Sequence, residues 1–266
     1  MREPIVEFHE ARLRNLADRS AENQLWPLWQ GTQLMAGKDR APPGVSRREL
    51  MIAAAVAGVL PAGAVRAALP VGWRELGFPL LRANRFDDIG GGVIQIDGKR
   101  ASSILYRPIA IDLGKTPRLS WRWRVDSGPP ATDLAIRGTD DRALAVIIGF
   151  PFDPATANAA ERSQHRAMRF LLGRAAPGRS LHYVWGSGLP RGSVIRPAKT
   201  TAHRFVILRP ASELPGMWHT ESVDVAADYR RIFGESPPRA VQLAISSDGD
   251  DTGSIVHAAI GGFRWD

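Results

Sequence analysis

Residues 120–126 read Ser-Trp-Arg-Trp-Arg-Val-Asp, and this stretch decides the fold class. Successive side chains of a β-strand point to opposite faces of its sheet. The alternation therefore places Trp121 and Trp123 on one face and Arg122 and Arg124 on the other. We expect the tryptophan face to pack into the core and the arginine face to be cationic, so the stretch predicts a half-buried strand.

The same period of two recurs along the rest of the chain, in segments bounded by glycine, proline, aspartate or asparagine. The predicted strands are 92–96, 103–109, 118–125, 143–150, 180–185, 203–209, 217–224, 240–246 and 255–265. Helical patterns occur at 157–173 and 227–233, as insertions between strands. The sequence therefore predicts a mainly β protein, a two-sheet antiparallel β-sandwich of the jelly-roll kind with one or two short helices inserted.

A twin-arginine export signal precedes this domain. Arg47 and Arg48 stand directly before the uncharged run 52–60, which is shorter than the roughly 20 apolar residues that span a bilayer. A buried alanine-rich helix would not explain the arginine pair together with the small residues at the end of the run. We expect cleavage after Ala67, with Ala68 as the neighbouring alternative.

The signal divides the chain into three segments. A start at Met35 gives the signal an n-region of ordinary length. We interpret 1–34 as an upstream mis-start or a disordered segment, 35–67 as the twin-arginine signal peptide and 68–266 as a single β-sandwich domain. The expected location is periplasmic or secreted, the expected partners during export are the twin-arginine translocase and signal peptidase, and no membrane span is expected in the mature domain.

Composition removes several classes of site. The chain has no cysteine, which excludes disulfides, thiolate metal sites and a cysteine nucleophile. It has 35 Lys and Arg residues against 27 Asp and Glu residues, but no basic cluster is interleaved with aromatics, so we expect no nucleic-acid partner. The histidines lack zinc-motif spacing, and Ser187 lacks the surroundings of a nucleophile elbow.

A series of motifs follows a familiar order along the domain. They are 120–126, 140–150, 183–186, 218–224, 228–234, 247–252 and 261–265. In this order they resemble an uncharacterised bacterial exported family, domain of unknown function 3047, from about Trp73 to the C-terminus, and the resemblance implies no activity. The last two motifs are also similar to the closing strands of galactose-binding-like sandwiches, a likeness of fold that assigns no ligand.

One loop contains a cluster of hard oxygen donors. Asp248, Asp250 and Asp251 lie within four residues and share the loop with the turn-forming Gly249. Carboxylate oxygens are the ligands that Ca²⁺ prefers, so this loop is the candidate metal site, although it lacks the closing glutamate of an EF-hand. The alternative is a polar hairpin whose aspartates bind backbone N–H groups. No other cofactor is indicated.

Charged residues on two consecutive strands suggest a ligand pocket. Asp140 and Asp141 enter the predicted strand 143–150, and a hairpin with the preceding strand would bring them close to Arg122 or Arg124. Arginines bind anionic or hydroxyl groups, and the carboxylates would orient them. The alternative is simple charge pairing beside a buried sheet.

Two aromatic residues on a third strand suggest a stacking surface. Tyr183 and Trp185 share one face, as aromatics that stack on sugar rings do, and the same spacing fits core residues.

These candidates favour a non-catalytic, exported binding protein that recognises a glycan or another envelope component. The alternative is a glycosidase-like hydrolase that uses two of Asp140, Asp141 and Glu221, which requires a pair within about 10 Å across an open groove. A purely structural role in the envelope is the third reading, and it predicts no pocket.

The export route gives a direct test. We expect the change of Arg47 and Arg48 to Lys to leave folded protein in the cytoplasm, because a twin-arginine signal requires the arginine pair. Fractionation of cells that express the wild type and the double variant measures this. Unchanged export of the variant would contradict the twin-arginine route.

Overall fold

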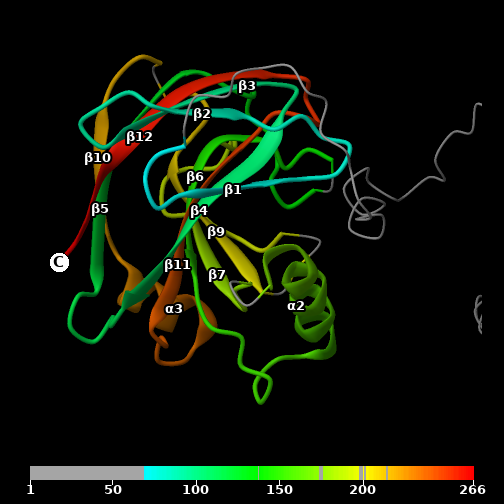
Figure 1. Cartoon of the computed structure of the whole chain (residues 1–266), viewed down its shortest axis with the longest axis vertical. Helices are drawn as coiled ribbons and strands as arrows, with labels where there is room; N and C mark the ends of the chain where they lie inside the picture. The colour runs from blue at the N-terminus through cyan, green and yellow to red at the C-terminus, as the bar shows by residue number, and fades with distance from the viewer. Residues whose placement is uncertain (1–68, 137, 174–175, 198–199, 201, 214) are drawn as a thin grey trace, which may run out of the picture. The chain divides into compact units, whose positions relative to one another are not determined.

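The strand that carries Trp121 and Trp123 lies inside a five-stranded sheet that packs face to face against a seven-stranded sheet (Figure 1). The computed structural model describes residues 69–266 except 137, 174–175, 198–199, 201 and 214. The predicted signal residues Arg47, Arg48 and Ala67 therefore lie outside the described residues.

The smaller sheet has the order β10 (His219–Asp224), β5 (Arg118–Ser127), β12 (Ile255–Trp265), β3 (Val93–Lys99) and β2 (Arg85–Asp88). The larger sheet has the order β1 (Arg74–Gly77), β4 (Ser102–Ile111), β11 (Ala240–Asp248), β6 (Arg142–Gly149), β7 (Ser180–Trp185), β9 (His203–Arg209) and β8 (Val194–Ile195). All these pairs are antiparallel except β7 with β9, which is parallel. The predicted two-sheet sandwich is confirmed, and β1, β2 and β8 are short strands that the alternation did not reveal.

The core between the sheets is built around four aromatic rings. Trp121 and Trp123 on β5 are 1% and 0% exposed, as the alternation predicts. Across the sandwich, Trp121 lies 5.8 Å from Tyr183 and Trp123 lies 5.5 Å from Trp185, measured between ring centroids. Tilted and edge-on pairs of this kind stabilise the core beyond the area that they bury.

The larger sheet is also covered on the side that faces away from this core. Every residue of β6 is buried, which a strand with one solvated face would not show. A second apolar cluster lies there and includes Leu134, Ile147 and Phe205, with Met168 packed against it. Met168 belongs to α2 (Ala159–Leu172), so this helix covers part of the outer face of the sheet.

Two helices are inserted between strands, as predicted. The capping box of α2 is complete: the Asn158 side chain accepts from the Glu161 backbone N–H, and the Glu161 carboxylate accepts from the Asn158 backbone N–H. The second helix, α3 (Val225–Phe233), begins after Asp224 and ends at Gly234, whose φ of +77° suits glycine. Among the described residues, no helix is both long and apolar enough to cross a membrane.

A buried carboxylate links the two sheets at one end of the sandwich. Glu221 on β10 is 1% exposed and accepts hydrogen bonds from the Trp123 indole at 3.2 Å and from Arg209 Nε at 2.7 Å. Arg191, from the loop between β7 and β8, adds a third contact at 2.8 Å. Because Arg209 ends β9 of the larger sheet, the carboxylate ties both sheets and a loop together.

We expect Glu221→Ala to lower the free energy of unfolding by about 3 kcal/mol, because it leaves two guanidinium groups and an indole N–H without their acceptor. Urea unfolding measures this. Glu213→Ala is the matched control, since Glu213 contacts the same Arg209 at 3.4 Å but is partly exposed, and its loss should cost less than about 1 kcal/mol. Equal losses in the two variants would show that Glu221 does not anchor the sheets.

Candidate functional site

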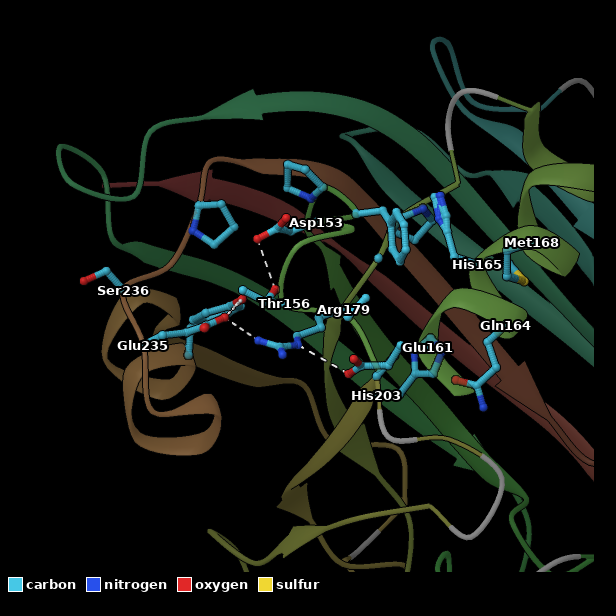
Figure 2. Close-up of a pocket in the computed structure, with 18 residues that line it drawn as sticks. Asp153, Thr156, Glu161, Gln164, His165, Met168, Arg179, His203, Glu235 and Ser236 are labelled. Atoms are coloured by element: carbon cyan, nitrogen blue, oxygen red, sulfur yellow. Dashed lines mark hydrogen bonds and ion pairs between the residues drawn. The ribbon is translucent and has the colours of Figure 1, made fainter. Parts of the chain in front are cut away.

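A cavity of about 270 Å³ lies beside the larger sheet, under the N-terminal half of α2 (Figure 2). It is lined by residues from 151–157, from α2, from 177–179, from 202–203, from the middle of α3 (Tyr229) and from 235–238. Apolar side chains such as Phe152, Met168 and Pro238 form much of its surface, and a few polar groups project among them. An apolar cavity with a few convergent polar groups is the usual form of a small-molecule site.

Arg179 is the central charged group of the cavity. Its guanidinium lies between two carboxylates: Nε is 3.5 Å from Glu161 Oε1, and NH1 contacts Glu235 Oε1 (Figure 2). The Tyr229 hydroxyl donates to Glu235 Oε1 at 3.2 Å. Burial opposes the charge of Arg179, but the hydrogen bonds and charges of Tyr229, Glu235 and Glu161 outweigh it and raise the pKa. This group therefore stays a cation and joins α2 to the segment after α3.

Two histidines of the cavity are neutral. Burial, together with the charges of Arg142 and Arg204, lowers the pKa of His203 to about 4. Burial and then Arg169 lower the pKa of His165. His165 stacks on Phe152 with ring centroids 3.9 Å apart, and its two ring nitrogens are buried without a hydrogen-bond partner among the described residues. Buried polar atoms without a hydrogen bond cost free energy, so the side chain of His165 on α2 is destabilising where it meets the cavity.

The structure corrects the predicted stacking surface. Tyr183 and Trp185 do share one face of β7, but that face points into the core, where they are 0% and 2% exposed. The Tyr183 hydroxyl reaches Asp228 of α3 at 3.1 Å. Both rings pack against the tryptophans of β5, so neither is available to stack on a sugar.

The predicted pocket of arginines and aspartates also does not form. Arg122 and Arg124 lie on the outer face of the smaller sheet, where both guanidinium groups lie over the ring of Trp218, at 5.0 and 5.3 Å. Asp140 and Asp141 precede β6, which belongs to the larger sheet. The chain crosses from one sheet to the other between β5 and β6, so the two strands are not a hairpin.

Asp141 instead joins the predicted metal loop. Carboxylate oxygens of Asp141, Asp248 and Asp250 lie within 4.8 Å of one another, a spacing that one cation with 2.3–2.6 Å bonds could bridge. Asp251 takes part through its backbone N–H, which donates to Asp141 at 3.4 Å. Two of the three predicted ligands, Asp248 and Asp250, therefore do lie together. The third carboxylate is that of Asp141, which the sequence analysis had paired with the arginines, and not that of Asp251.

Protein groups already contact the two buried carboxylates of this cluster. Asp141 is fully buried and accepts from the backbone N–H and the hydroxyl of Thr252, both at 2.7 Å. Asp248 forms an ion pair with the buried Arg142 at 3.3 Å. These contacts are those of the polar hairpin that the sequence offered as the alternative, and calcium binding stays a prediction.

The three carboxylates of the predicted hydrolase do not form a site together. Glu221 is held by two arginines inside the sandwich, and Asp141 is fully buried under the 248–252 loop. Neither of these residues, nor Asp140, lines the cavity beside α2.

Sequence reasoning did not identify the residues that line this cavity. Arg179, His203 and Glu235 come from three separate segments, and none belongs to a short motif. The one local signal was the spacing of Asn158 and Glu161, which is that of a capping box and indicates a helix start, not a binding site.

The fold and the cavity define a mainly β sandwich protein with a small-molecule-sized cavity on one side. The family model described as protein of unknown function (DUF3047) matches residues 71–264, so the chain belongs to this family, as the motif order predicts. No curated protein matches the chain.

Three solved structures show a broad similarity to the sandwich. The xyloglucanase domain of NopAA from Sinorhizobium fredii is 10% identical with a TM-score of 0.41, and the match covers 73% of this chain and 92% of that one. A family 12 xyloglucanase from Bacillus licheniformis is 8% identical with a TM-score of 0.38, covering 76% and 88%. Endoglucanase 3 from Trichoderma harzianum is 8% identical with a TM-score of 0.32, covering 75% and 100%. These values are too low to assign an activity.

The metal prediction can be tested without knowing the function. If the loop binds calcium, added Ca²⁺ should raise the Tm of the chelator-treated protein, because a ligand that binds only the folded state stabilises it. Differential scanning calorimetry measures this, with Mg²⁺ as the control ion, and Asp250→Asn should remove the shift. An unchanged Tm at millimolar Ca²⁺ would leave the loop as a polar hairpin.

Proposed function

We propose that this protein is an exported, non-catalytic binding protein whose cavity holds about one ring of an uncharged, hydroxyl-rich ligand, such as a sugar unit of a glycan or envelope component. The observation that carries this is the polar set in the cavity, where the donor Arg179 lies beside the acceptor Glu235 and the Tyr229 hydroxyl. A hydroxyl group both donates and accepts, so neighbouring hydroxyls of a sugar match alternating donors and acceptors.

The charge of the cavity favours an uncharged ligand over an anion. Among the residues that the structure describes, its charged lining consists of Asp153, Glu161 and Glu235 against the cation Arg179, and His165 and His203 are neutral. An anionic ligand would therefore meet a net negative wall and would compete with the two glutamates for one guanidinium.

The apolar part of the lining supports the same ligand class. Sugar rings present C–H groups on their faces, and these pack on apolar and aromatic side chains. Phe152, Met168 and three prolines supply such surfaces around the polar set. The volume of about 270 Å³ lies just below the roughly 300–1,000 Å³ of sites for drug-sized molecules, which suits a single ring.

A hydrolase remains the second candidate class, and the geometry of the cavity favours binding over it. Hydrolysis of a glycoside needs one carboxyl group to give a proton and a second to act as base or nucleophile. Both oxygens of Glu161 are engaged, by Arg179 and by the Asn158 backbone N–H. Glu235 is paired with the same arginine. These carboxylates are held as hydrogen-bond acceptors.

The proposal is tested by isothermal titration calorimetry of the mature protein with glucose, galactose and cellobiose as uncharged probes, and with glucuronate and glucosamine as the anionic and cationic ones. We expect at least one uncharged probe to bind and glucuronate to bind more weakly. Glu235→Gln should weaken that binding roughly tenfold, because one charge-assisted hydrogen bond becomes a neutral one.

The matched control is Asp266→Asn, which makes the same change of carboxylate to amide at an exposed residue outside the cavity lining. It should leave the affinity unchanged. Absence of binding for all three uncharged probes, or tighter binding of glucuronate, would contradict the proposal. Release of glucose from cellobiose during the titration would favour the hydrolase.

A further inference from the structure

Three polar side chains stand together on the cavity side of the parallel strand pair. Ser180 begins β7, His182 lies two residues further along the same face, and His203 begins β9 directly opposite Ser180. Ser180 Oγ is 2.8 Å from His182 Nε2 and 2.5 Å from His203 Nδ1, and these two nitrogens are 3.2 Å apart. Ser180 and His182 are buried, whereas His203 lines the cavity.

Both imidazoles are neutral, so each carries one N–H and one lone pair. Burial, followed by the charges of His203 and Arg142, lowers the pKa of His182 well below its ordinary value. The same burial and Arg142 hold the pKa of His203 at about 4. Two neutral rings and one hydroxyl leave four ways to place the ring protons.

Two of the four arrangements fail at the short contact between the rings. If both facing nitrogens, His182 Nε2 and His203 Nδ1, carried protons, both N–H groups would have to donate to Ser180 Oγ from nitrogens only 3.2 Å apart, which crowds the two hydrogens and leaves the Ser180 O–H to find another acceptor. If neither carried one, two lone pairs would oppose each other, and the Ser180 hydroxyl could donate to only one of them. The arrangements without these conflicts are the two in which one ring donates to Ser180 Oγ and the Ser180 hydroxyl donates to the other ring.

The direction is decided by the far nitrogen of His182. Its Nδ1 is buried and has no hydrogen-bond partner among the described residues. If the chain of bonds ran from His203 to His182, the proton of His182 would sit on this Nδ1 as an orphaned buried N–H. Such orphans are rarer in proteins than unmet acceptors. The favoured direction is therefore His182 Nε2–H to Ser180 Oγ, and Ser180 O–H to His203 Nδ1.

This direction places the proton of His203 on Nε2. Among the described residues, His203 Nε2 has no hydrogen-bond partner. It is also absent from the buried polar atoms that lack a partner, so it is not shielded from solvent as they are. Since His203 lines the cavity and Nδ1 is occupied by Ser180, Nε2 is the ring nitrogen left to meet a ligand.

We propose that His182 and Ser180 are positioning residues that fix His203 as a permanent N–H donor toward the cavity. Any ligand must then place an acceptor at this wall, such as a hydroxyl, ring or carbonyl oxygen, and a group that only donates is rejected. This part rests on the proposed function, because it assumes that the cavity binds a ligand. The tautomer itself does not.

The tautomer is measured by long-range ¹H–¹⁵N correlation NMR of the ligand-free mature protein at pH 7, with ¹⁵N-labelled histidine. We expect His203 and His182 each to carry the proton on Nε2, with Nδ1 unprotonated. A proton on Nδ1 of His203, or an average of both tautomers, would overturn the proposal without any reference to a ligand.

The two hydrogen bonds from His182 to Ser180 and from Ser180 to His203 form the proposed relay. Two variants of Ser180 separate a positioning role from a packing role. Ser180→Ala removes the hydroxyl and should let His203 exchange between tautomers, whereas Ser180→Thr keeps the hydroxyl and should preserve Nε2–H. With the uncharged probe that binds the wild type, Ser180→Ala should weaken binding roughly tenfold and Ser180→Thr should retain most of the affinity. Equal weakening in both variants would contradict the relay.

The two proposals can fail separately. If the wild type shows the expected tautomer but no uncharged probe binds, the proposed function fails and the relay stands. If a sugar binds while the His203 tautomers average, the relay fails and the proposed function stands.

Discussion

The packing of the β5 tryptophans against the aromatic residues of β7 is the constraint on which the rest of the structure depends. Trp121, Trp123, Tyr183 and Trp185 are all at most 2% exposed and bring the two sheets into contact. Because side chains alternate strictly along a strand, burying these rings also decides where every neighbouring side chain points. On β5 the arginines must face outward. On β7 the alternate residues, which include His182, must face away from the core, toward the side where the cavity lies.

Burial of the aromatic residues also imposes polar requirements that organise one end of the sandwich. An indole N–H inside a core needs an acceptor, and the Trp123 indole finds it in Glu221. A carboxylate at that depth in turn needs positive partners, which Arg209 and Arg191 supply. A single buried ring thus accounts for a network that reaches from the smaller sheet through β10 to the end of β9 and into the loop between β7 and β8.

Most of the fold followed from local alternation, while most of the site did not. The nine predicted strands and both helices recur in the structure, and only strands of two to four residues were missed, because so short a run shows no period. The alternation correctly predicts that Tyr183 and Trp185 share one face of a strand. It cannot distinguish a face that packs into the core from one that binds a ligand. The pairing of the arginines with Asp140 and Asp141 failed because sequence neighbours β5 and β6 belong to different sheets. The cavity has no local signal, since segments far apart in the chain build it.

The cavity lies on the side of the larger sheet that α2 covers. Both faces of β6 are buried, so the sheet needs α2 as a covering, and this helix is held there by the apolar Met168 and by the ion pair of Glu161 with Arg179. Glu161 reaches Arg179, while the nitrogens of His165 find no partner in the part of the chain that the structure describes. Apolar side chains at these positions would pack without the cost of desolvating polar groups. The polar groups kept at the cavity wall, above all the buried Glu161 and the ring nitrogens of His165, are the physical argument for the proposed ligand site.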